Sequence, residues 1–170
     1  MYYCTTCLSP VGLLTLASDG KNLAGLWLEG QKYHGRSIPG PMTKKDDLSV
    51  FDETRSWLTG YFAGKKPSPS SLPLNPTGTG FRQRVWKALC EIPYGQITTY
   101  STIAAKITPE SEPPENYRRA VGGAIGHNPI SIIIPCHRVI GADGSLTGYA
   151  GGVERKVELL ALEGVDVSRF

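Results

Sequence analysis

The sequence predicts an α+β fold, in which a small N-terminal antiparallel sheet domain with a helix precedes a mainly helical C-terminal domain containing a helix-turn-helix. Three observations predict it. Residues 1–35 alternate as strands do, residues 67–76 hold four prolines, and short apolar helical stripes recur after that segment. We therefore place the domains at residues 1–77 and 78–170, the first serving as a support.

The N-terminal half predicts strands at residues 13–17 and 23–28, separated by a turn at 19–22. A helix is expected at about 49–63. Its buried stripe would comprise Phe51, Trp57, Leu58, Tyr61 and Phe62, and Asp46 and Asp47 would cap it. The proline-rich segment 65–76 suits neither a helix nor a central strand, so we expect a linker.

The C-terminal half predicts short helices. The first helix is expected at about 79–92, with Thr79 as its cap. The second is expected at 100–107, with Thr98 or Thr99 as its cap. The third is expected at about 116–126. The second and third resemble a helix-turn-helix, joined by an unusually long connection.

The end of the chain predicts one more strand and one more helix. The run 130–134, which is apolar apart from Ser131, indicates a buried strand. The last helix is expected at about 153–163, and Gly164 would end it. Its inward residues would be Val153, Val157, Leu160 and Ala161.

Composition excludes several classes of protein. With 40% apolar residues and a net charge of +3, the 170-residue chain is not intrinsically disordered. It has no apolar run long enough for a membrane span and no signal peptide, so we expect a cytoplasmic protein. The four cysteines do not form a disulfide framework, and Cys4 and Cys7 lack the further ligands of a metal site, so we expect no metal.

The net charge is too small to indicate a nucleic-acid partner by itself. Cations do cluster along the second half, at Arg82, Arg84, Lys87, Arg118, Arg119 and Arg138. They are as compatible with a solvated helix surface as with a phosphate-binding face.

A candidate nucleophile follows the apolar run directly, in Pro135-Cys136-His137-Arg138. A thiolate is strongly nucleophilic, and a neighbouring histidine can take its proton. Glu163 is a candidate third group, because a carboxylate near a helix C-terminus is unfavourable unless it has a partner. Taken alone, however, a Cys-His pair is more often an inert buried cysteine beside a surface histidine.

Several motifs in order resemble one family. They are Asn128–Gly141 around the PCHR tetrapeptide, Arg119–Ala124, Ile92–Gly95 with Tyr100, Thr147–Gly152, and the Glu163-Gly164 ending. This set resembles the O6-alkylguanine-DNA alkyltransferases, also called methylated-DNA–protein-cysteine methyltransferases. The resemblance is dense over residues 79–164 and is weaker before them.

The resemblance implies a role for each matching residue. Cys136 would accept the alkyl group, His137 would be its base through a water molecule, and Glu163 would orient that histidine. Asn128 would brace the turn that carries the cysteine. Tyr100 would lie by the displaced phosphate and help to protonate the leaving guanine.

The resemblance also implies a double-stranded DNA partner carrying alkylated bases, and base flipping, which costs a few kcal/mol. Arg119 would fill the gap in the base stack. The base pocket would be lined by the ring of Tyr149 and by the backbones of Cys136, Val139 and Ala150. The DNA backbone would lie against four further residues, Thr99, Ser101, Ala120 and Gly122. We expect a single turnover without a cofactor, because a thioether offers water no leaving group. We expect a monomer, with cooperative assembly on DNA left open.

Two departures and two rival functions stay open. Ala150 stands where some members have serine, and the connection 108–117 is several residues longer than usual. A lesion-binding protein without chemistry would bind DNA equally well as Cys136→Ala. A cysteine hydrolase would turn over repeatedly and would not need Arg119. The sequence does not rank alkyl groups, or O6-alkylguanine against O4-alkylthymine.

Overall fold

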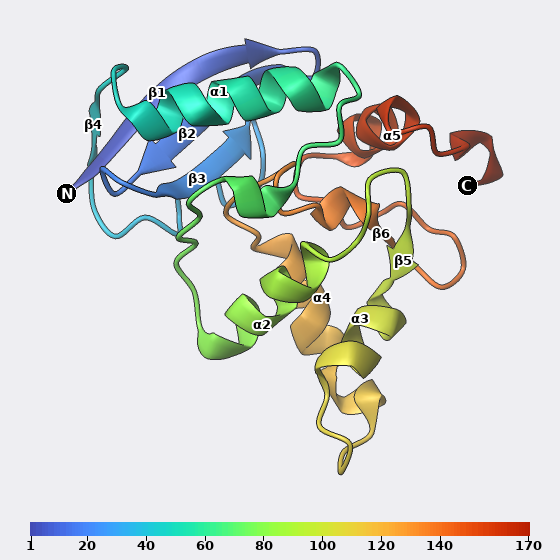
Figure 1. Ribbon diagram of the computed structural model, residues 1–170. Coiled ribbons are helices and arrows are strands. Elements are labelled where there is room, and N and C mark those ends of the chain that lie inside the picture. Colours follow the sequence, from blue (N-terminus) through green and yellow to red (C-terminus); the bar gives the residue numbers. More distant parts are fainter. The chain divides into compact units, whose positions relative to one another are not determined.

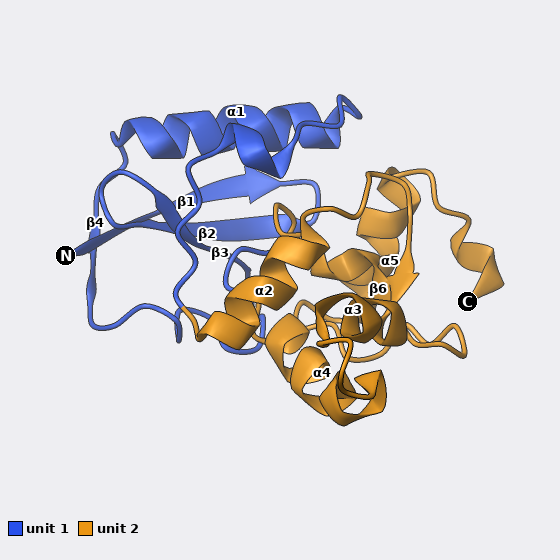
Figure 2. Ribbon diagram, turned by 60° about the horizontal axis from the view of Figure 1, so that its bottom comes forward, with its two compact units in different colours: residues 1–77, 129–131 blue, residues 78–128, 132–170 orange.

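The computed structural model describes residues 1–170, which form two compact units (Figure 2). Unit 1 comprises Met1–Thr77 together with Pro129–Ser131, and unit 2 comprises Gly78–Asn128 and Ile132–Phe170. The chain therefore returns briefly to unit 1 just before the PCHR motif. The predicted boundary after residue 77 places those three residues in the second domain instead.

Unit 1 is built on a four-stranded sheet of order β3-β2-β1-β4. Its strands are β1 Tyr2–Ser9, β2 Gly12–Ser18, β3 Leu23–Leu28 and β4 Met42–Lys44. The first three form an antiparallel meander, which confirms the expected sheet. The short β4 pairs in parallel with β1 and had not been predicted.

Helix α1, Ser49–Phe62, lies along this sheet (Figure 1). It buries four of the five predicted stripe residues, while Phe62 is only partly buried. The expected capping by aspartates is wrong, because the residue at the cap is Leu48 and no side chain caps the helix. Asp46 instead accepts a hydrogen bond of 2.5 Å from Thr5 Oγ1, which ties the segment before α1 to the sheet.

The proline-rich segment is an ordered part of unit 1 and not a free linker. It contains the 3-10 helix Pro69–Ser71, followed by the buried Leu72. The Leu23 amide donates to the Pro73 carbonyl and the Asn75 amide donates to the Leu23 carbonyl, both at 2.8 Å. Proline lacks an amide proton but keeps its carbonyl, so it can lie along a sheet edge.

Unit 2 is mainly helical, as expected. Its elements include α2 Gly80–Leu89, β5 Thr98–Thr99, α3 Tyr100–Ile107, α4 Arg118–Gly126, β6 Val139–Ile140 and α5 Val153–Leu162. The predicted caps of the first two helices are confirmed, because Thr79 Oγ1 accepts from the Arg82 amide and Thr99 Oγ1 accepts from the Thr102 amide. No helix is both long and apolar enough to cross a membrane.

The strand expected at 130–134 is wrong, because only Ile130 makes a strand-like bridge, to Leu26. The Leu26 amide donates to the Pro129 carbonyl at 2.8 Å, and the Ser131 amide returns a bond to the Leu26 carbonyl at 2.9 Å. Ile132 then has a φ of 71°, which turns the chain away from a strand. The apolar run is buried as a turn, and Cys136 begins the 3-10 helix Cys136–Arg138.

The predicted inward face of α5 is partly wrong. Leu160 is buried and Val157 is partly buried as predicted, but Val153 is 43% exposed and Ala161 is exposed. Lys156 and Leu159 are buried and had not been predicted to be. Glu163, the residue after the helix, is buried as well. The buried face therefore follows helical spacing but carries a charged residue at each end, so a search for apolar residues cannot find it.

Candidate active site

The Cys136 side chain is buried, at 4% exposure, and is held by Asn128. The Asn128 side-chain amide donates to the Ile134 carbonyl at 2.7 Å and lies 3.1 Å from the Cys136 sulfur, to which it also donates. Sequence analysis predicted only the bracing of the turn. One amide group therefore fixes the turn and also polarises the sulfur.

The environment of Cys136 opposes a free thiolate but offers it several stabilising groups. Burial raises the pKa of the thiol above its usual value. The Asn128 amide, the Lys156 charge and the backbone amides of Cys136 and His137 act in the opposite direction and do not fully offset burial. The thiol is therefore protonated at rest and needs a base before it can act as a nucleophile.

His137, the next residue along the chain, has a buried imidazole that contacts Glu163. Its Nε2 lies 2.7 Å from Glu163 Oε1, and both side chains are fully buried. Burial lowers the pKa of His137, although the Glu163 carboxylate counteracts this. A neutral imidazole beside a carboxylate directs its proton to the carboxylate, so Nε2 carries the proton and Nδ1 remains the acceptor.

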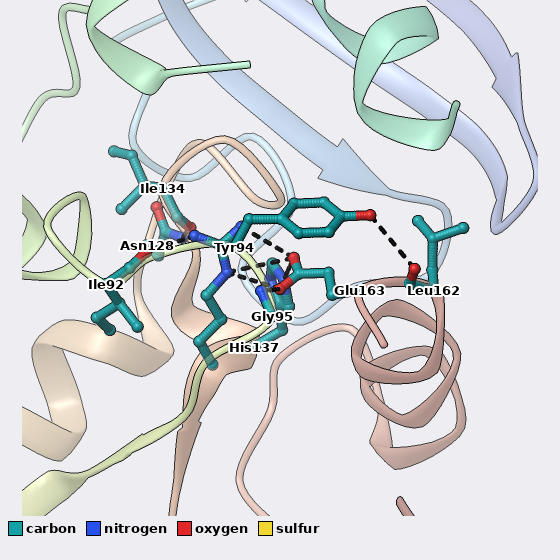
Figure 3. A network of polar contacts seen from close by, with 9 residues as sticks. Ile92, Tyr94, Gly95, Asn128, Ile134, His137, Leu162 and Glu163 are labelled. Carbon is teal, nitrogen blue, oxygen red and sulfur yellow. Dashed lines mark hydrogen bonds and ion pairs between the residues drawn. The ribbon is translucent and has the colours of Figure 1, made fainter. Parts of the chain in front are cut away.

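Glu163 is the centre of the polar network (Figure 3). Besides His137, its carboxylate accepts from Arg138 Nε and Nη2, both at 2.9 Å, and from the Gly95 amide at 3.0 Å. Burial alone would raise the pKa of Glu163, but the hydrogen bonds from His137 and Arg138 lower it to about 2. The carboxylate therefore stays ionised at neutral pH.

Arg138 belongs to this network and not to a DNA-facing basic surface. It is 6% exposed, and besides Glu163 it donates to the Ile92 carbonyl at 2.6 Å. Its guanidinium lies 5.8 Å from the centre of the Tyr94 ring. The sequence had suggested it as a phosphate-binding cation, so that candidate is corrected. Its charge instead compensates the buried carboxylate.

Comparisons with known proteins identify the family of the chain. The family model described as "6-O-methylguanine DNA methyltransferase, DNA binding domain" matches residues 80–165, and that of the "ribonuclease-like domain" matches residues 2–76. A Haemophilus influenzae methylated-DNA–protein-cysteine methyltransferase is 46% identical, covering 91% of this chain and 82% of its own. One from Methanosarcina barkeri is 49% identical, covering 91% and 92%.

The chain belongs to the 6-O-methylguanine DNA methyltransferase family. A solved structure of Mycobacterium tuberculosis OGT in complex with DNA is similar to it. The two are 45% identical with a TM-score of 0.78, over 99% of this chain and 93% of that one.

Two tyrosines of this methyltransferase, Tyr100 and Tyr149, interact electrostatically with Cys136. Burial raises the pKa of Tyr100 and of Tyr149, and negative charge on Cys136 raises both further. The Tyr149 hydroxyl is buried and has no hydrogen-bond partner. Such a group needs a partner, and a bound substrate can supply one. Of the other residues expected to line the base pocket, Val139 is buried and Ala150 is partly buried.

The expected DNA-contacting residues lie on the surface of α3 and α4 or next to them. Arg119 and Ala120 are exposed in the first turn of α4, while Thr99, Ser101 and Gly122 are partly exposed. A Cβ atom added at Gly122 would meet nothing within 4 Å, so the helix backbone is open to close approach there. This surface is suited to lying in a DNA groove.

Lys156 is not among the residues that the motifs indicate. Its side chain is fully buried, and Nζ donates to the Val139 carbonyl at 2.6 Å. Burial lowers its pKa to about 8, although a negative charge on Cys136 acts in the opposite direction. The only signal for it was helical spacing, because Lys156 lies seven positions before Glu163 on one face.

We predict that Lys156→Met slows alkyl transfer at pH 7, because a buried cation that stabilises the developing thiolate is lost. Lys156→Arg keeps the charge and should slow the reaction less. The lysine is largely protonated below about pH 8 and largely neutral above it, so the difference between the wild type and Lys156→Met should shrink as the pH rises above about 8. Single-turnover rates from pH 6 to pH 9 measure the effect. Equal rates of the wild type and Lys156→Met at pH 7 would contradict it.

Proposed function

We propose that the protein repairs DNA by transferring an alkyl group from O6-alkylguanine to its own Cys136, once per molecule. The observation that carries this proposal is a buried cysteine whose sulfur accepts from Asn128, directly followed in the chain by a buried His137 whose imidazole contacts an ionised Glu163. Membership of the methyltransferase family supports it.

The groups present can perform each step. The Cys136 thiol proton passes to His137 Nδ1, through a water molecule, and the Glu163 carboxylate stabilises the resulting imidazolium. The sulfur attacks the alkyl carbon in line, the S–C bond forms and the C–O6 bond breaks with its electron pair on guanine. Tyr100 supplies a proton to the leaving base. The thioether product has no group that water can displace, so the protein is consumed.

The surface of α3 and α4 supports double-stranded DNA as the partner. The alkyl carbon lies within the base stack, so the nucleotide must be flipped into the pocket. Arg119 is exposed at the start of α4 and long enough to fill the vacated space. In this proposal Thr99, Ser101, Ala120 and Gly122 lie against the DNA backbone.

A cytoplasmic location and a monomeric state remain part of the proposal. All four cysteines are free thiols, and an acceptor thiol persists only where the surroundings are reducing. Unit 1 contains none of the reactive residues, so we assign it a supporting role.

The test is the mass of the intact protein after incubation with duplex DNA carrying O6-methylguanine. We expect one added methyl group, located on Cys136 by peptide mapping, and none on Cys136→Ala. Unmodified protein with the lesion still present would overturn the proposal. Bound but unchanged lesion DNA would instead favour a lesion sensor, and repeated turnover of an acyl substrate would favour a cysteine hydrolase.

Arg119→Ala should slow the repair of duplex DNA far more than the reaction with a free O6-alkylguanine base. The free base needs no flipping, so the stack-filling side chain has no part in that reaction. Single-turnover rates with the two substrates give the comparison. Lys44→Ala, on β4 of unit 1, serves as a control for the loss of one exposed cation. Equal losses with both substrates would refute the role of Arg119.

A further inference from the structure

The connection between α3 and α4 is longer than a helix-turn-helix needs, and it is ordered. Figure 1 shows it projecting beyond the two helices. The Glu112 amide donates to the Pro109 carbonyl at 3.0 Å, and the chain then forms the 3-10 helix Pro114–Tyr117. Arg118, the first residue of α4, follows without a break.

An aromatic contact anchors the connection to α2. The Tyr117 ring stacks on Phe81 with the ring centres 6.2 Å apart and an angle of 23° between the planes. The Arg84 guanidinium lies 5.6 Å from the centre of the Phe81 ring. The Tyr117 hydroxyl donates to Glu112 at 2.6 Å, which ties the projecting part back to the anchor. The acidic side chains are therefore held beside the start of α4.

The charge of the connection is opposite to that of the helix it precedes. Residues 109–117 contain three glutamates and no lysine or arginine, and Glu110, Glu112 and Glu115 are all exposed. Directly after them, Arg118 and Arg119 are exposed on the first turn of α4. The N-terminal residues of a recognition helix approach the DNA most closely, so these carboxylates oppose phosphate binding where it matters most.

One of the carboxylates is paired with a cation of this turn. Glu115 Oε1 lies 3.8 Å from Arg118 Nη2, and both side chains are more than half exposed. An exposed ion pair of this kind is weak, so a DNA phosphate can replace the carboxylate. While the pair is intact, however, Arg118 does not release a counterion from DNA.

We propose that the α3–α4 connection restrains binding to undamaged DNA, with Glu115 competing against DNA phosphate for Arg118. On a duplex that offers only its backbone, Glu115 retains Arg118, which then makes no phosphate contact, whereas a lesion adds the contacts of the flipped base. The restraint lowers the time spent on undamaged sites. This inference rests on the proposed DNA-binding function, but its test uses undamaged DNA and does not depend on alkyl transfer.

The experiment measures the dissociation constant for an undamaged duplex as a function of salt concentration. Glu115→Gln should bind about threefold more tightly at low salt, and the slope of log K against log[salt] should steepen by about 0.9, the value for one added phosphate contact. Glu110→Gln is the matched control, because it removes the same charge from the same connection without an ion pair to Arg118. Its slope should equal that of the wild type.

Two further variants distinguish the effect of the Glu115–Arg118 ion pair from that of the overall negative charge of the connection. In an Arg118→Gln background, Glu115→Gln should leave the slope unchanged, because the released cation is absent. Equal slopes for Glu115→Gln and Glu110→Gln, or a steeper slope that persists without Arg118, would overturn the inference. Failure of the proposed function would appear differently, as an unmethylated Cys136 after incubation with lesion DNA.

Discussion

Replacing Arg138 by methionine should lower the free energy of unfolding by about 3–5 kcal/mol, the usual cost of removing one partner of a buried ion pair. The Glu163 carboxylate would remain fully buried with its charge uncompensated by arginine. The Ile92 carbonyl would also lose its 2.6 Å donor. Urea unfolding followed by tryptophan fluorescence measures the change.

Two further variants make this prediction specific. Arg138→Lys keeps a positive charge but loses the fork that contacts both carboxylate oxygens, so its loss of stability should be smaller. In the double variant Arg138→Met with Glu163→Gln, the buried charge is removed from both sides, and part of the stability should return. A stability of Arg138→Met within about 0.5 kcal/mol of the wild type, the range of ordinary surface substitutions, would contradict the assigned role.

Replacing Asn128 by aspartate should slow alkyl transfer by at least about 10²-fold, by analogy with the removal of a single preorganised donor from an active site. A carboxylate cannot donate to the Ile134 carbonyl or to the sulfur, which lie 2.7 and 3.1 Å from the present amide nitrogen. It would also place a negative charge beside the developing thiolate and raise the pKa of the Cys136 thiol.

Asn128→Ala provides the control, because it removes the donor without adding charge. It should slow the reaction less than the aspartate variant, and it should raise the thiol pKa less. Single-turnover rates and thiolate absorbance against pH distinguish the two variants. If both change the rate equally while the thiol pKa stays at its wild-type value, Asn128 only braces the turn and does not act on the sulfur.

Local signals predicted much of the fold. The antiparallel meander followed from turn residues between short apolar strands, and the caps at Thr79 and Thr99 followed from hydroxyl side chains placed before apolar stripes. These features depend on neighbours within a few residues, so a single sequence displays them. The strand predicted at 130–134 is wrong, because composition distinguishes buried segments from exposed ones but does not distinguish a strand from a buried turn.

The candidate site was predicted in part. Asn128, Cys136, His137 and Glu163 were singled out from motifs, and the structure brings all four together in unit 2. Arg138 was placed on the wrong surface and Lys156 was not considered. Charged residues are expected at the surface, and only their partners, distant in sequence, reveal that they are buried.

The sequence by itself determined the order of the elements, the reactive residue types and the family to which they point, because these depend on local spacing and on motifs. Only the tertiary structure decided which charges are buried. Arg138 and Glu163 are 25 positions apart, and Lys156 and Val139 are 17 apart. A buried charge is tolerated only where an opposite charge or a hydrogen-bond partner meets it, and the folded chain alone brings such partners together.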